Sequence, residues 1–137
     1  MGEDLAGANV NRAYTLAASS IAIFTFTLFF LYPRYVNGEA NALLFQATIA
    51  VMGMATFSFV FASLYYYRAS LGRVEEADRA SCSRRADRFW LFGYSLLFLA
   101  PTLILFSLGL LAVGAVWFVL WLVFFFFVIR YFPGVRS

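Results

Sequence analysis

Residues 89–129 read FWLFGYSLLFLAPTLILFSLGLLAVGAVWFVLWLVFFFFVI and contain no charged side chain. A helix that crosses the hydrocarbon core of a bilayer needs about 20 residues, so this stretch is about twice the length of one span. Small residues and a glycine interrupt it at 107–112 (SLGLLA), which favours a tight turn there. We therefore predict two membrane-spanning helices joined by an apolar hairpin. The alternative is one continuous helix across the whole stretch.

Two further charge-free stretches lie earlier in the chain, at residues 13–33 and 40–67. The first has the length of one span, and the second has the length of one long or tilted span. The sequence thus predicts an all-α, polytopic integral membrane protein that forms a single domain over residues 1–137. Its four transmembrane helices are expected at 13–33, 41–67, 89–107 and 112–132, with a polar loop at 68–88.

The amino-acid inventory supports the membrane assignment and excludes many kinds of chemistry. Hydrophobic residues make up 64% of the chain and charged residues 12%, against roughly 45–50% and about 25% in soluble domains. The chain has no His, no Lys and one cysteine, Cys82. It therefore lacks an imidazole base or metal ligand, a Schiff-base lysine and the cysteines of a structural zinc site. We expect no cofactor, no metal site and no enzymatic activity.

The arginines predict the orientation in the membrane. All ten basic residues are Arg, and with four spans only Arg34 falls on one side, which leaves nine on the other. Basic residues concentrate on the cytoplasmic side of membrane proteins. We therefore expect both termini and the 68–88 loop to face the cytoplasm, with the protein in the cell or inner membrane. Since these arginines flank apolar spans, we expect no nucleic-acid partner.

Two local signals predict where helices end. Pro33 is expected to end the first helix, and Asn37-Gly38 is expected to form the turn that follows. Within the 68–88 loop, residues 73–80 have a helical pattern. Ser81-Cys82-Ser83 is expected to break that helix before the third span begins.

Polar and small residues form a seam along the second span. Asn41, Thr48, Ala55 and Ala62 recur every seven residues, and Ser58 lies beside them. Small and polar residues at this spacing let membrane helices approach closely. The seam is either a packing face or the lining of a polar pathway in an oligomer. Gln46 lies on a shorter stripe of the same helix, where its amide either bonds to a neighbouring helix or contributes to selectivity.

The 68–88 loop carries most of the arginines. Five of them are candidate contacts for anionic lipid headgroups or for a partner protein: Arg73, Arg79, Arg84, Arg85 and Arg88. The acidic residues of the same loop alternate with arginines, so the loop does not resemble a divalent-cation site.

Three classes of function remain. The first, which we expect, is a homo-oligomeric channel or uncoupled transport pathway, because the first two spans carry polar residues and the fourth is almost entirely apolar. Without charges in its spans, such a pathway would select a solute by constriction, hydroxyls and carbonyls. The second is an accessory or assembly subunit of a larger membrane complex, with the seam packed against a partner. The third is an enzyme that acts on lipids, for which the sequence offers little chemistry. We expect the protein to be either a homo-oligomer or the partner of another membrane protein.

Overall fold

The computed structural model describes residues 2–71 and 74–131. Over these residues the chain forms four helices: α1 (Gly2–Val36), α2 (Ala42–Ser70), α3 (Glu76–Ser107) and α4 (Leu111–Tyr131). The described part of the chain contains no strand, so the predicted all-helical fold is confirmed. All four helices are long and apolar enough to cross a membrane. The stretch 89–129 does turn between α3 and α4, which excludes a single continuous helix.

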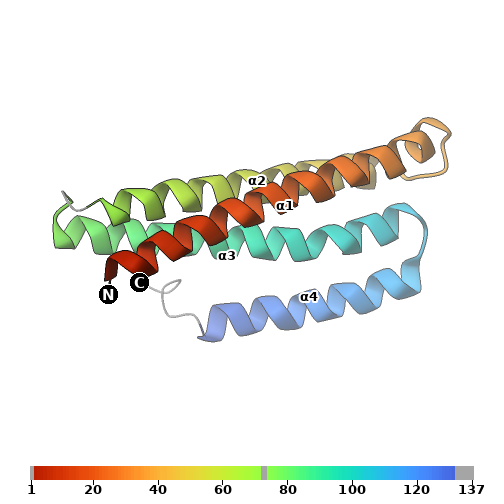
Figure 1. Ribbon diagram of the computed structural model, residues 1–137. Coiled ribbons are helices and arrows are strands. Elements are labelled where there is room, and N and C mark those ends of the chain that lie inside the picture. Colours follow the sequence, from red (N-terminus) through yellow and green to blue (C-terminus); the bar gives the residue numbers. More distant parts are fainter. Residues whose placement is uncertain (1, 72–73, 132–137) are drawn as a thin grey trace.

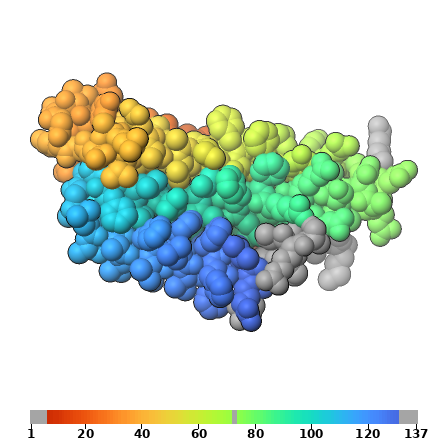
Figure 2. Space-filling model, turned by 180° about the vertical axis from the view of Figure 1, so that it is seen from behind, coloured from red at the N-terminus to blue at the C-terminus, as the bar shows by residue number. Residues whose placement is uncertain are grey.

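The helices form a three-helix group with a fourth helix at its edge (Figure 1). α2 packs against both α1 and α3, whereas α4 packs mainly against α3. Viewed from the opposite side, α3 lies between α2 and α4, and α4 forms one edge of the molecule (Figure 2). Most of the surface of α4 is therefore not covered by the rest of the chain.

Small side chains make up much of the core between α1, α2 and α3. On each helix they repeat at helical spacing and are buried: Ala13, Ala17 and Ser20 on α1; Ala55, Ala62 and Ala69 on α2; Ala86, Gly93 and Ala100 on α3. Such residues let helix axes approach closely, and they are typical of contacts between membrane helices. The largest fully buried side chains, Phe59 and Met52, fill the space between them.

Hydrogen bonds fix both turns at one end of the molecule. The side chain of Asn41 caps α2 by accepting from the backbone N–H of Leu44 at 3.1 Å. The Asn41 backbone N–H donates to the Ser107 carbonyl at 3.1 Å, which ties the start of α2 to the end of α3. Gly38 and Gly109 have φ values of 74° and 75°, in the left-handed region that glycine adopts at helix ends.

Two predicted helix ends are wrong. α1 continues through Pro33 to Val36, and its last turn is held by the Asn37 N–H, which donates to the Pro33 carbonyl at 3.0 Å, and by stacking of Tyr35 on Phe45 of α2. The turn at Asn37-Gly38 follows as predicted. α3 runs without interruption through Ser81-Cys82-Ser83, where Cys82 is buried and helps to hold the helix in place. Residues 76–88 are therefore the first turns of α3 and not an irregular loop.

One contact attaches the middle of α4 to α3. The indole N–H of Trp121 donates to the backbone carbonyl of Ser95 at 2.7 Å. Closer to the turn, Gly114 leaves room for the Phe106 ring, which a Cβ on residue 114 would meet at 2.7 Å. The rings of Phe98 on α3 and Phe124 on α4 also pack together, with 4.9 Å between their centroids, so α4 contacts α3 along one face.

Most of the arginines lie at the end of the molecule opposite these two turns. We call this the Arg-rich end; it comprises the start of α1, the end of α2, the start of α3 and the end of α4 (Figure 1). Its described arginines are Arg12, Arg68, Arg79, Arg84, Arg85, Arg88 and Arg130, whereas Arg34 lies at the other end. The helix arrangement therefore separates the basic residues as a four-span topology requires.

Candidate functional site

The structure places most of the α2 seam inside a single chain. Thr48, Ala55 and Ala62 are 0% exposed, and Ser58 is 4% exposed. The Thr48 hydroxyl donates to the Leu44 carbonyl at 2.8 Å, and the Ser58 hydroxyl donates to the Met54 carbonyl at 2.7 Å. Because their own helix satisfies these hydroxyls, neither needs water or a polar partner across an interface. These four residues form a packing face within the chain.

Asn41 and Gln46 lie apart from that buried face. Asn41 is exposed at the end of α2, where its side chain serves as the helix cap. Gln46 is exposed on the outward surface of α2, and Ala50 continues that surface one turn further on. Gly53, half-buried, comes next, and a Cβ there would meet no atom within 4 Å. Asn41 therefore shares the seven-residue spacing of Thr48 and Ala55 but does not belong to their buried face.

Sequence reasoning missed the helix faces that meet the seam. On α1, the Ser20 hydroxyl is hydrogen-bonded to the Thr56 hydroxyl of α2 at 2.8 Å, and Ser20 is fully buried. On α3, Ala86, Gly93 and Ala100 repeat every seven residues, as the seam does. That repeat was visible in the sequence and would have predicted a second small-residue face opposite α2.

The arginines of α3 differ in exposure. Arg84, Arg85 and Arg88 are exposed on the first turns of the helix, and Arg79 is half-buried with its Nε atom lacking a hydrogen-bond partner among the described residues. Arg85 and Arg88 line an open cavity of about 340 Å³ with Phe89 and Phe92. This surface combines guanidinium groups with aromatic rings. Arg73 lies outside the described residues.

A second cavity at the Arg-rich end has a mixed lining of charged, polar and aromatic side chains. Its volume is about 230 Å³, and six residues from α1, α2 and α3 surround it: Asn9, Arg12, Tyr66, Asp87, Trp90 and Leu91. The hydroxyl of Tyr66 donates to a carboxylate oxygen of Asp87 at 2.5 Å. Sequence analysis did not identify this site, because its residues come from three helices and have no common spacing.

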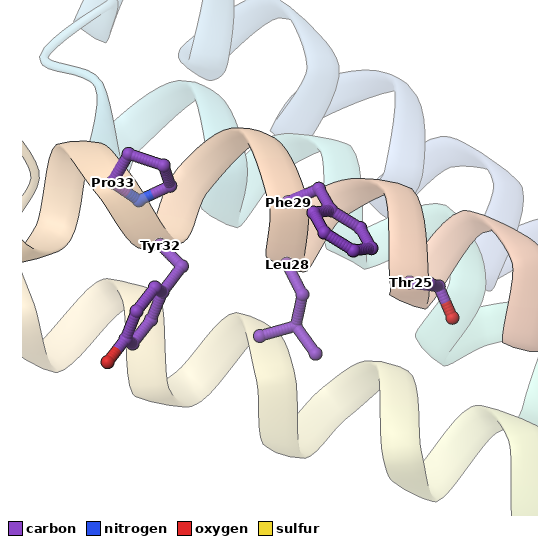
Figure 3. A pocket seen from close by; sticks show the side chains of 5 residues that line it. All are labelled: Thr25, Leu28, Phe29, Tyr32 and Pro33. Carbon is purple, nitrogen blue, oxygen red and sulfur yellow. The ribbon is translucent and has the colours of Figure 1, made fainter.

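A third cavity lies near the opposite end, on α1. Its lining is almost entirely apolar and comprises Thr25, Leu28, Phe29, Tyr32 and Pro33, with a volume of about 310 Å³. Figure 3 shows Leu28 and Tyr32 projecting from one edge of α1 and Pro33 from the opposite edge. The Thr25 hydroxyl donates to the Ile21 carbonyl at 2.9 Å, so it offers no free donor to a ligand. In a bilayer this surface would be in contact with acyl chains.

Comparisons with known proteins add no assignment: the chain matches no protein-family model, no curated protein and no solved structure. Within residues 7–71 and 74–131, no group of three or more acidic, His or Cys side chains is placed to hold a metal ion. The function is therefore inferred from the chain's own geometry.

Proposed function

We propose that the protein is an integral membrane protein that acts by associating with further transmembrane helices, as an accessory or assembly subunit and not as an enzyme. In the proposed orientation the Arg-rich end and both termini face the cytoplasm. The observation that carries the proposal is the outward surface of α2, where Gln46 is exposed beside Ala50 and Gly53. We call these three residues the outer α2 stripe.

The side-chain amide of Gln46 has no hydrogen-bond partner among the described residues. An unpaired amide in contact with hydrocarbon is unfavourable, so a neighbouring helix that supplies a partner is stabilised. Ala50 and Gly53 would allow that helix to approach, since the space beside Gly53 is open. The stripe therefore combines a polar group with room for close packing.

Lipid headgroups complete the proposed surroundings. Arg84, Arg85 and Arg88 project from the first turns of α3, close to where the helix would leave the hydrocarbon. α3 is 32 residues long. At about 1.5 Å per residue it reaches roughly 48 Å, which exceeds the roughly 30 Å of hydrocarbon. The arginines would thus lie among anionic headgroups, which attract them by about 1 kcal/mol each.

The exposed amide of Gln46 also favours a second candidate, a homo-oligomeric channel or uncoupled pathway. In a ring of copies with the outer α2 stripe facing the axis, the Gln46 amides would form the polar lining. Such a pathway would select by constriction and amide contacts, since the apolar stretches of the spans carry no charge. The buried seam residues would then support the lining helix from behind.

Cross-linking in native membranes tests the proposal, with a photo-cross-linker attached to a single cysteine so that either a second copy or a different chain is captured. We would replace Cys82, the only cysteine, by Ala and then introduce Gln46→Cys, with Thr48→Cys as the matched control on the buried face. Association through the outer α2 stripe predicts cross-linked products at position 46 and none at position 48. Native mass spectrometry would then separate a homo-oligomer from a complex with a second chain.

Absence of cross-linking at 46 in native membranes, with the protein intact, would contradict the proposal. For the second candidate, flux in proteoliposomes should fall when Gln46→Leu removes the amide. Flux that is unchanged in a correctly assembled Gln46→Leu oligomer would contradict the channel.

A further inference from the structure

The cavity at the Arg-rich end carries both signs of charge, and they are not paired with each other. Arg12 of α1 is exposed, and Asp87 of α3 is half-buried, and both line the cavity. Among the described residues Arg12 has no ion-pair partner, and Asp87 is bonded only to the Tyr66 hydroxyl through one of its two oxygens. A guanidinium and a carboxylate oxygen thus remain available within one small cavity.

The base of the cavity is rigid and well packed. Tyr66 and Leu91 are 6% and 7% exposed. Tyr66 belongs to a buried cluster with Ala13, Ala62 and Ala86, against which Trp90 also packs. The Tyr66 hydroxyl fixes the Asp87 carboxylate from this cluster. The Asp87 carboxylate is therefore held in place by the core of the three-helix group and not by a loop.

We propose that this cavity binds an ammonium–phosphate zwitterion of the phosphoethanolamine type, with the phosphate on Arg12 and the ammonium on Asp87. A guanidinium forms strong paired hydrogen bonds to phosphate, and an ammonium forms strong hydrogen bonds to a carboxylate. The Asn9 side chain adds a neutral donor near Arg12. A simple anion would be repelled by Asp87, and a simple cation would be repelled by Arg12, so a ligand with both charges fits best.

Volume and hydrogen bonding narrow the choice of ligand. The cavity, at about 230 Å³, is smaller than the usual range of about 300–1,000 Å³ for whole drug-sized ligands, which suits a headgroup. A primary ammonium donates three hydrogen bonds, whereas a quaternary ammonium donates none and is usually bound by several aromatic rings. The cavity lining contains two aromatic side chains, Tyr66 and Trp90, which is fewer than the several rings that usually surround a quaternary ammonium. The site therefore favours ethanolamine over choline.

Either a lipid or a free small molecule supplies this chemistry. With the Arg-rich end at the membrane surface, as in the proposed function, the headgroup of phosphatidylethanolamine would lie at the height of the cavity. A water-soluble phosphoethanolamine compound would reach the same cavity from the aqueous side. The two sources differ in whether acyl chains are needed for binding.

The experiment measures binding by the full-length protein after its lipids are removed. Nanodiscs with equal amounts of phosphatidylethanolamine, phosphatidylglycerol and phosphatidylcholine supply the lipid arm, and native mass spectrometry counts the lipids retained. The soluble arm is calorimetric titration with glycerophosphoethanolamine, with glycerophosphocholine for comparison. The variants are Arg12→Gln and Asp87→Asn, and the matched control is Arg34→Gln, at an exposed arginine at the opposite end of the molecule. Asn at position 87 keeps an oxygen to accept from Tyr66, and gel filtration checks the fold.

The site predicts about tenfold preference for phosphatidylethanolamine over the other two lipids. Both cavity variants should lose this preference, and Arg34→Gln should keep it. Binding of glycerophosphoethanolamine as well would support a free ligand as the source, whereas binding of the lipid alone would support the membrane. Equal retention of all three lipids together with no glycerophosphoethanolamine binding would overturn the proposal, and so would a preference that survives in Arg12→Gln. These readouts concern single chains, so they stand apart from any failure of association through the outer α2 stripe.

Discussion

A substitution at Gly93 tests the packing of α2 against α3 most sharply. Gly93 is buried on α3, and a Cβ placed there would lie 3.0, 3.1 and 3.2 Å from three ring carbons of Phe59 on α2. The Phe59 ring is 0% exposed, and its edge packs against Tyr94 with 5.5 Å between ring centroids and an interplanar angle of 87°. The ring therefore has no free space into which it can turn.

Gly93→Ala should lower the free energy of unfolding relative to a matched control. Overpacking of a tight core costs about 1–3 kcal/mol. Alanine also gains up to about 1 kcal/mol of helix propensity over glycine. The control is Gly53→Ala, which makes the same change in α2 with no atom within 4 Å of the new Cβ. Because both variants share the propensity gain, the difference between them isolates the Phe59 contact at about 1–3 kcal/mol.

The assay is equilibrium unfolding of the purified protein in mixed micelles, followed by circular dichroism. Phe59→Leu supplies the second arm, since the shorter side chain vacates the space around residue 93. The double variant should be more stable than the sum of the two single changes by about 0.5–3 kcal/mol, as for other residues in direct contact. If Gly93→Ala matches Gly53→Ala in stability, and the Phe59 double variant is additive, then α2 and α3 do not pack as described.

Three further predictions concern other contacts. Trp121→Phe removes the indole hydrogen bond that joins α4 to α3 and should lower the free energy of unfolding by about 0.5–1.5 kcal/mol. Calorimetry measures this loss against Trp117→Phe, whose indole has no such bond among the described residues. Equal stability of the two variants would contradict the role of the Trp121 bond. Tyr66→Phe removes a hydrogen bond to a carboxylate and should lower the free energy of unfolding by about 1.5–3 kcal/mol in the same assay. Tyr65→Phe should change it little, because the Tyr65 ring stacks on Phe89 and its hydroxyl has no hydrogen bond among the described residues. Equal losses of stability in the two variants would contradict the role assigned to the Tyr66 hydroxyl. Thr48→Trp places an indole where the residue is 0% exposed and should reduce the yield of folded protein on gel filtration; a fully folded variant that merely blocks flux would instead indicate a pathway along the seam.

The sequence was sufficient to predict the number of helices and the position of the last turn. A charge-free stretch of known length reports how many times the chain can cross the hydrocarbon. Gly109 marked the hairpin because a helix that ends in the left-handed region favours glycine. These features depend on local composition, which is visible without knowledge of the packing.

The lengths of the helices were less accessible from sequence. Charge-free stretches mark the part of a helix suited to hydrocarbon, whereas backbone hydrogen bonding continues well beyond it. α3 accordingly begins at Glu76 and contains Cys82, although the serines around Cys82 indicated a break. The helix-breaking tendency of Ser is small, and packing of the buried Cys82 and Ala86 outweighs it at this position.

The roles of the polar residues could not be assigned from spacing alone. A seven-residue repeat identifies one face of a helix but not the element that covers it. Thr48 and Ala55 are covered by the same chain, whereas Gln46 faces outward. The cavity that contains Arg12 and Asp87 depends on three helices meeting at one end, which no single segment encodes. Such sites become visible only with the tertiary arrangement.

Cysteine accessibility tests the central claim, that the α2 seam lies inside one chain and the outer α2 stripe faces outward. In the Cys82→Ala background, single cysteines at Thr48, Ala55 and Gln46 would be treated with membrane-permeant and water-soluble methanethiosulfonate reagents, using folded single chains in detergent micelles. Positions 48 and 55 are expected to stay unmodified until the protein is denatured, whereas position 46 should react in the folded chain. Modification of positions 48 and 55 by the water-soluble reagent, at rates matching position 46, would contradict the account and place water along the seam.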